Sequence, residues 1–190
     1  MKRPLNIFFA RKRSAQAGMT LVETMIALAI LLVVAAGVMG LAGVAVSTTE
    51  TQGHLAARTA EYAQDKMEQL LALKFCDGTT DTTVFPAVVN NTGTGLAGCT
   101  NPTAPTPTAS AGGGLSTTAP TTGYVDYLDA SGNLVASTAS WEYVRVWQIT
   151  VPAGSVGLKQ IAVLAQANHS VGGSAVVPQS TVVALKTFPF

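Results

Sequence analysis

A long apolar run, from Met25 to Val46, constrains the fold of this chain more than any other feature. Its 22 residues include no charged side chain, amide or hydroxyl. As a helix rising 1.5 Å per residue, the run would extend about 33 Å, enough to cross a bilayer. A secretory signal peptide has a shorter apolar region, of about 7–15 residues, followed by a small-residue cleavage site. The run therefore predicts a membrane-spanning helix.

Glu23 lies just before this run and is the second constraint. A carboxylate near hydrocarbon costs roughly 2.5–3.5 kcal/mol even on lenient insertion scales, so we expect it to have a partner and a function. Gly18 separates the apolar segment from a basic leader. The basic residues of the leader are Lys2, Arg3, Arg11, Lys12 and Arg13. A plain membrane anchor would explain the length of the run, but it explains neither Glu23 nor Gly18.

The stretch Gly-Met-Thr-Leu-Val-Glu, which begins at Gly18, resembles the processing site of type IV prepilins. The resemblance implies that prepilin peptidase cuts between Gly18 and Met19 on the cytoplasmic side and then N-methylates Met19. Glu23 matches the glutamate that, in this family, registers a subunit against the N-terminus of its neighbour. Major pilins usually have Phe at the position of Met19, whereas minor pilins and pseudopilins tolerate Met.

The distribution of charge predicts the topology of the chain. Positively charged segments stay on the cytoplasmic side, so the C-terminal part should face the periplasm from a single-pass position in the bacterial inner membrane. After cleavage, ten acidic residues stand against six basic ones, a net charge of −4. This balance argues against nucleic-acid binding, because no broad basic surface remains to neutralise phosphates.

Cys76 and Cys99 would then lie in an oxidising compartment, where a disulfide can persist. Two free thiols are the alternative. We expect no metal site, because two cysteines without nearby histidines do not make a ligand set. We expect no cofactor.

Five segments follow from these patterns. The first helix has no proline between Met19 and Phe75, and apolar or small residues recur at helical period beyond the membrane run. Gly37, Gly40, Gly43 and Gly53 are its weak points. The expected order is a cleaved leader at 1–18, a membrane or filament-core half of the helix at 19–46, an amphipathic half at 47–75, a low-complexity loop region at 76–123 and an antiparallel β head at 124–190.

Alternating apolar residues predict the strands of the head. In the run 141–151, Trp141, Tyr143, Trp147, Ile149 and Val151 share one face with Arg145 among them, and we expect that face to pack on the long helix. An aromatic ligand surface is the alternative. Pro178 should push the last strand to an edge. The predicted strands are 84–89, 124–128, 133–137, 141–151, 158–167 and 176–186, so the fold class is α+β and pilin-like.

No catalytic residues are recognisable, because His54 and His169 have no nucleophile motif or metal-ligand spacing nearby. We expect two exposed histidines and no enzyme. The turn at 129–132 is similar to a calcium loop but lacks the further acidic ligands.

The best interpretation is a structural minor pilin of a type IV pilus. The strands WEYVRVWQITV and GLKQIAVLAQA, with the helix AILLVVAAG, resemble the type IV pilus modification protein family. The expected partners are prepilin peptidase, other pilins or pseudopilins, an inner-membrane assembly platform and, before assembly, membrane lipid. The alternatives are a type II secretion pseudopilin and a membrane-anchored adhesin or DNA-uptake tip.

Overall fold

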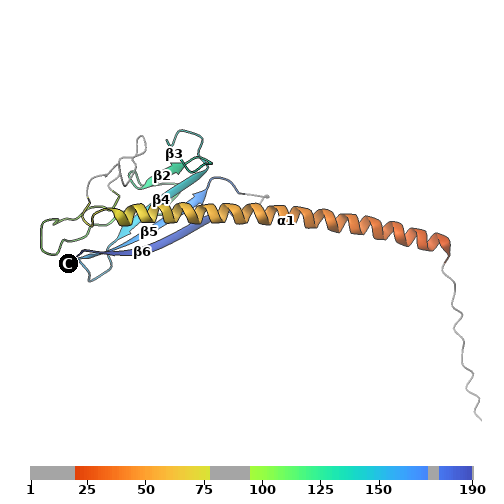
Figure 1. Cartoon of the computed structure of the whole chain (residues 1–190), viewed down its shortest axis with the longest axis horizontal. Helices are drawn as coiled ribbons and strands as arrows, with labels where there is room; N and C mark the ends of the chain where they lie inside the picture. The colour runs from red at the N-terminus through yellow and green to blue at the C-terminus, as the bar shows by residue number, and fades with distance from the viewer. Residues whose placement is uncertain (1–19, 78–94, 171–175, 190) are drawn as a thin grey trace, which may run out of the picture. The chain divides into compact units, whose positions relative to one another are not determined.

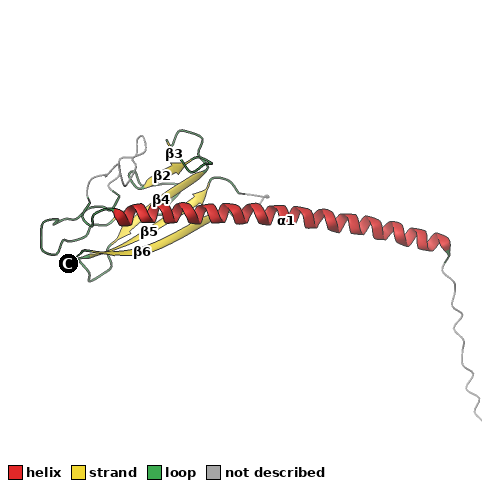
Figure 2. Cartoon of the chain, in the orientation of Figure 1, coloured by secondary structure: helices red, strands yellow, loops and turns green. Residues whose placement is uncertain are grey.

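The computed structural model describes residues 20–77, 95–170 and 176–189. The chain divides into two compact units, Met1–Ala45 and Val46–Phe190, and each is considered by itself. The helix α1, Leu21–Ala72, runs through the boundary between them (Figure 1). The strands within the described residues are β1 Gly112–Gly113, β2 Val125–Leu128, β3 Leu134–Val135, β4 Tyr143–Thr150, β5 Leu158–Ala167 and β6 Gln179–Thr187 (Figure 2).

The strands form one antiparallel sheet in the order β3-β2-β4-β5-β6, and β1 pairs with β4. The predicted hairpin is present, because β2 pairs with β3 across the turn at 129–132. β6 lies at the edge of the sheet, as predicted, but it begins at Gln179, so Pro178 precedes the strand instead of lying within it. The predicted strand at 84–89 lies outside the described residues.

The second half of α1 covers one face of the sheet, and the core lies between them (Figure 1). Four buried helix residues, spaced at helical period, face the strands: Tyr62, Ala63, Met67 and Leu70. Trp147 of β4 is fully buried against them, as are three residues of β5, Ile161, Val163 and Ala165. This packing confirms the α+β class and the prediction that the apolar sheet face is covered by the helix.

Trp141 does not lie on the helix-covered face of the sheet, where the sequence predicted it. It precedes β4 and packs with Tyr127, their ring centroids 5.3 Å apart, on the side of the sheet formed by Val125, Val144 and Val146. The prediction was wrong because β4 begins only at Tyr143. Side chains alternate between the two faces of a sheet only within a strand, so the pattern does not extend back to Trp141.

The loop region 76–123 contains more structure than the sequence predicts. Gly112 and Gly113 lie in this predicted loop region, but they form β1 and pair with Ile149 and Gln148. A Cβ atom on Gly113 would lie 2.3 Å from the carbonyl oxygen of Trp147, and φ at Gly113 is 76°. Only glycine therefore lets this segment approach β4 so closely. A second short contact is the bridge between Cys99 and Ala109.

The helix is shorter than predicted at its C-terminal end and unbroken at its expected weak points. It ends at Ala72 rather than Phe75, and it runs continuously through Gly37, Gly40, Gly43 and Gly53. The last turn has no basic residue of its own. Lys186 of β6 supplies the missing cation, because its ammonium group donates to the carbonyl oxygen of Leu71.

Candidate functional site

The start of α1 is fixed by Thr20 and Glu23. The backbone N–H of Glu23 donates to the Thr20 carbonyl at 3.0 Å and lies 3.4 Å from its hydroxyl oxygen. This Thr-x-x-Glu spacing is typical of a helix N-terminus. A carboxylate in the first turn also interacts favourably with the helix dipole. The same residues that begin the helix therefore place an exposed Glu23 in its first turn.

The apolar half of α1 has no cover from the described residues. Helix α1 is long and apolar enough to cross a membrane, and none of the residues in its most apolar stretch is buried. Large apolar side chains are exposed all round this half: Leu21, Val22, Met25, Ile26, Leu28, Ile30, Leu31, Leu32, Val33, Val34, Val38, Met39, Leu41, Val44 and Val46. A helix that is apolar on every side is stable against lipid or other helices, not in water.

The predicted site residues are only partly placed by the structure. Gly18 and Met19, where cleavage and methylation are predicted, lie outside the described residues. Within the described part of the chain, no side chain or backbone group makes an ion pair or hydrogen bond with the carboxylate of Glu23. The roles assigned to these three residues stay predictions.

Cys76 and Cys99 form a disulfide, with Cα atoms 4.9 Å apart. The predicted disulfide is confirmed, and the alternative of two free thiols is wrong. The bond ties the end of α1 to the segment that begins at Gly95. Beside it, the buried ammonium of Lys159 donates to three backbone carbonyls, those of Phe75, Leu96 and Gly98.

A buried charged cluster, which we did not predict, joins α1 to the sheet. The ammonium of Lys66 lies 2.6 Å from the carboxylate of Asp126, and the guanidinium of Arg145 lies 3.0 Å from the same oxygen. Arg145 also reaches Asp65, whose side chain is 55% exposed, at 2.7 Å. Lys66 lies 4.4 Å from the centre of a Trp147 ring. Burial lowers the pKa of Lys66 to about 8, although the neighbouring Asp126 opposes the shift.

The sequence held only part of the signal for this cluster, namely charged residues at positions that alternate with or lie among apolar ones. Lys66 falls among the buried apolar positions of the helix, and Asp126 and Arg145 take core-side positions on neighbouring strands. Charged residues are rarely fully buried unless they are paired, so three of them on core faces indicate a common contact.

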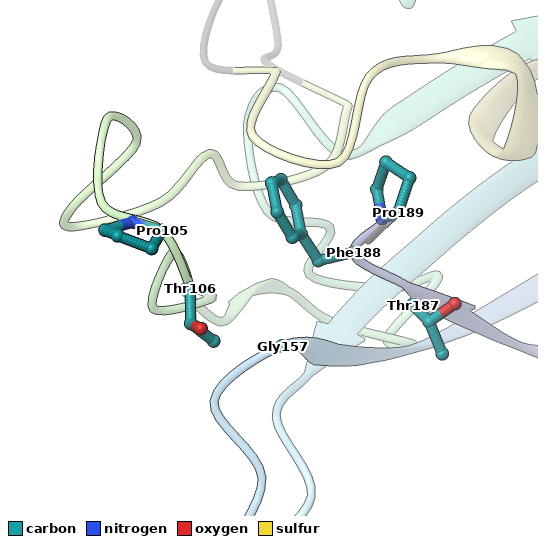
Figure 3. Close-up of a pocket in the computed structure, with 6 residues that line it drawn as sticks. All are labelled: Pro105, Thr106, Gly157, Thr187, Phe188 and Pro189. Atoms are coloured by element: carbon teal, nitrogen blue, oxygen red, sulfur yellow. The ribbon is translucent and has the colours of Figure 1, made fainter.

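An open cavity of about 300 Å³ lies where the loop at 101–106 meets the C-terminal end of β6 (Figure 3). Figure 3 shows Pro105 and Thr106 on one side, Phe188 and Pro189 on the other, and Gly157 between them. Thr187 completes the lining. No charged residue and none of the predicted site residues is among the six that line this cavity.

The remaining polar features match simple structural roles. His54 is exposed, and His169 is 69% exposed and lies 3.2 Å from Glu142. Asp129 accepts hydrogen bonds from the backbone of Ser131 and from the backbone and side chain of Asn133, which closes the hairpin turn. Those hydrogen bonds, first of all from Asn133, lower the pKa of Asp129. Among the described residues, no group of three His, Cys, Asp or Glu side chains could hold a metal ion.

Comparison with known families matches the prokaryotic N-terminal methylation motif to residues 13–39. No curated protein and no solved structure matches the chain. The matched stretch includes Gly18, Met19 and Glu23, and it ends within the apolar half of α1. The motif, together with the one helix in the described ranges that is long and apolar enough to span a membrane, is consistent with a single-pass protein of the inner membrane. The chain is therefore type IV prepilin-like, with a pilin-like architecture of one long N-terminal helix and an antiparallel sheet.

Proposed function

We propose that this chain is a structural minor pilin, which is processed by prepilin peptidase and assembled into, or primes, a type IV pilus. One observation carries the proposal. The apolar half of α1 begins inside a methylation motif, none of the residues in its most apolar stretch is buried by the described residues, and the carboxylate of Glu23 makes no ion pair or hydrogen bond with them. Other copies of such a helix would satisfy both.

The order of events follows from the chemistry of these residues. Before assembly the apolar half of α1 lies in inner-membrane lipid, with the head in the periplasm. Cleavage after Gly18 exposes the α-amino group of Met19, which N-methylation leaves cationic. In a low-dielectric filament core, the Glu23 carboxylate of one subunit attracts the Met19 ammonium of the next more strongly than it would in water. Burial of the apolar helices against one another supplies affinity, while the ion pair sets their register.

The head is proposed to present a rigid surface and to perform no reaction. Its buried charged groups, Lys66, Asp126 and Arg145, contact one another, and Lys159 contacts backbone carbonyls. Such contacts stabilise a fold but do not pair a nucleophile with a general base. The motif implies prepilin peptidase and other pilins as partners. We propose the inner-membrane assembly platform as a further partner.

The methylation motif equally favours a second candidate, a pseudopilin of a type II secretion system, because both classes carry it. Cell fractionation distinguishes them. A minor pilin is recovered with sheared surface pili, whereas a pseudopilin stays with the envelope. A membrane-anchored adhesin or DNA-uptake tip would instead show saturable binding of a ligand to the head, and the net charge of −4 after residue 18 disfavours DNA.

The first test is mass spectrometry of the mature N-terminus from native membranes. We expect a chain that begins with N-methylated Met19. An intact Met1, or a cut beyond the apolar helix, would overturn the proposal, because no prepilin processing would then have occurred.

A further inference from the structure

Lys159 occupies an unusual position beside the disulfide. It lies on the core face of β5, next but one to Ile161, and its side chain is fully buried. Its ammonium donates to the carbonyl oxygens of Phe75 at 2.8 Å, Leu96 at 2.6 Å and Gly98 at 2.5 Å. These three contacts use the whole donor capacity of an ammonium group. It also lies 5.0 Å from the centre of the Phe75 ring.

Two of these three carbonyls are covalently adjacent to the disulfide. Phe75 precedes Cys76, and Gly98 precedes Cys99. One side chain therefore donates hydrogen bonds to the peptide carbonyls immediately before both cysteines. A backbone hydrogen bond from Gly98 to the Asp77 carbonyl, 3.1 Å long, joins the same two segments on the other side of Cys76.

The strand pairing shows how specific this arrangement is. Lys159 lies directly opposite Lys186 in the antiparallel register of β5 and β6. Like charges in such positions repel, so both ammonium groups need acceptors. Lys186 donates to the Leu71 carbonyl at the end of α1, whereas Lys159 donates to the cysteine-flanking carbonyls. The two lysines thus have similar acceptors, but only one of them touches the disulfide segments.

We propose that Lys159 is a positioning residue for the disulfide: it holds the segments of Cys76 and Cys99 together in the dithiol form and so favours formation and persistence of the bond. Charge-assisted hydrogen bonds from a buried ammonium are stronger than neutral ones, because the surroundings screen them poorly. Once the two segments are aligned, the thiols lose little further freedom when the bond closes. This raises their effective concentration toward each other.

The redox step balances with a thiol–disulfide oxidant such as oxidised glutathione. A thiolate of one cysteine attacks a glutathione sulfur and releases one reduced glutathione. The second cysteine thiolate then attacks the mixed disulfide and releases another. The two protein thiols are oxidised, one glutathione disulfide is reduced, and the thiol protons pass to the released thiolates or to buffer. Lys159 takes no part in these bonds.

The test is the equilibrium of the full chain, purified in a mild detergent, with glutathione redox buffers at pH 7. Samples are quenched with acid and alkylated, and the oxidised fraction is read by intact mass. Lys159→Met keeps the length of the side chain but removes its three donors. Lys186→Met is the matched control, because it removes a lysine–carbonyl contact that does not flank a cysteine. Near-ultraviolet circular dichroism confirms that both redox forms of each variant are folded.

We expect Lys159→Met to lower the equilibrium constant for disulfide formation roughly tenfold, and Lys186→Met to change it less than about twofold. A purely structural role would weaken the oxidised and reduced folds alike and leave this constant unchanged. An unchanged constant in folded Lys159→Met, or an equal fall in Lys186→Met, would overturn the proposal.

A measurement on the wild-type chain covers the case in which Lys159→Met does not fold. Coupling between two sites is reciprocal, so the disulfide must strengthen the hydrogen bonds of the ammonium as much as they strengthen the disulfide. The pKa of Lys159, followed by NMR of the labelled side chain, should therefore be higher in the oxidised chain than in the reduced chain. Equal pKa values of Lys159 in the two forms would overturn the proposal, and this measurement needs no variant.

Discussion

Lys66 and Asp126 meet in the core of the head, with 2.6 Å between ammonium nitrogen and carboxylate oxygen and at most 1% of either side chain exposed. The contact joins α1 to β2, which are distant in sequence. Arg145 shares the same carboxylate oxygen, so one buried anion serves two buried cations. Such a cluster fixes which helix residue faces which strand, because a shifted register would leave a charge unpaired.

Replacement of Asp126, the shared anion, should lower the free energy of unfolding substantially. Asp126→Asn retains the shape but leaves Lys66 and Arg145 without their buried counter-charge, and we expect a loss of about 3–5 kcal/mol in the free energy of unfolding. Asp65→Asn is the control, since Asp65 contacts Arg145 from a half-exposed position and should lose less than about 1 kcal/mol. Denaturant unfolding followed by tryptophan fluorescence measures both. Similar losses in the two variants would contradict the dominant role of Asp126.

The same cluster predicts a dependence of stability on pH. Burial lowers the pKa of Lys66 in the fold to about 8 from its ordinary 10.5, so between these values the unfolded chain binds more protons than the folded one. The free energy of unfolding should therefore rise with pH above about 8. Tyr143 opposes this above its ordinary pKa of 10.0, because burial raises its pKa in the fold. Lys159 contributes in the same sense as Lys66, because burial also lowers its pKa to about 8.

The measurement is a series of unfolding curves between pH 7 and about 10 for the wild type and for Lys66→Met. We expect the free energy of unfolding to rise less steeply with pH in the variant, because it lacks one of the two buried lysines whose pKa falls to about 8 in the fold. Identical slopes would mean that Lys66 does not titrate in this range.

The two tryptophans should differ in their contributions to stability. Trp147 is fully buried beneath α1, and its ring N–H donates to the Gly95 carbonyl at 3.1 Å. Trp147→Ala should cost about 3–5 kcal/mol, from lost contacts, a cavity and an unpaired carbonyl. Trp141→Ala should cost clearly less, because this half-buried ring packs on the other side of the sheet. Thermal unfolding of both variants checks the order, and a larger effect at Trp141 would contradict it.

The strands β2 to β6 could be predicted from the sequence because their signals are local. Alternation in 158–167 and the turn at 129–132 each depend on neighbouring residues only, and the structure has β5 with the predicted bounds. The end of α1 depends on contacts from elsewhere: Lys186 of β6 donates to the Leu71 carbonyl, and Lys159 of β5 donates to the Phe75 carbonyl just after the helix. No property of residues 70–75 alone predicts those contacts.

The errors have the same origin. Gly112 and Gly113 look like chain breakers in isolation, and only the close approach of the Trp147 carbonyl shows why they form a strand. The charged cluster needed the pairing of β2 with β4 and the docking of α1, neither of which is written in one segment. The methylation motif was the opposite case, because Gly18, Met19 and Glu23 lie within six residues of sequence and inside the matched stretch.

Gly18 should act as a substrate residue for the peptidase. Gly18→Val places a branched side chain at the predicted cleavage site, and we expect the precursor to stay uncut, with the basic leader attached. Membrane insertion should persist, because the apolar half of α1 is unchanged. Immunoblots of membranes, with intact mass as confirmation, distinguish precursor from mature chain. Complete processing of this variant would move the cleavage site elsewhere.

Glu23 should act later, at assembly. Glu23→Gln removes the charge but keeps the size and helix position, so insertion and cleavage should continue while incorporation into filaments falls at least about tenfold, the effect of losing roughly 1.4 kcal/mol of interaction. Glu50→Gln is the matched control, because Glu50 is an exposed glutamate of the same helix outside the methylation motif. The ratio of subunit in sheared filaments to subunit in membranes measures incorporation. Normal incorporation of Glu23→Gln would exclude the registration role, and an equal defect in Glu50→Gln would assign the effect to helix charge in general.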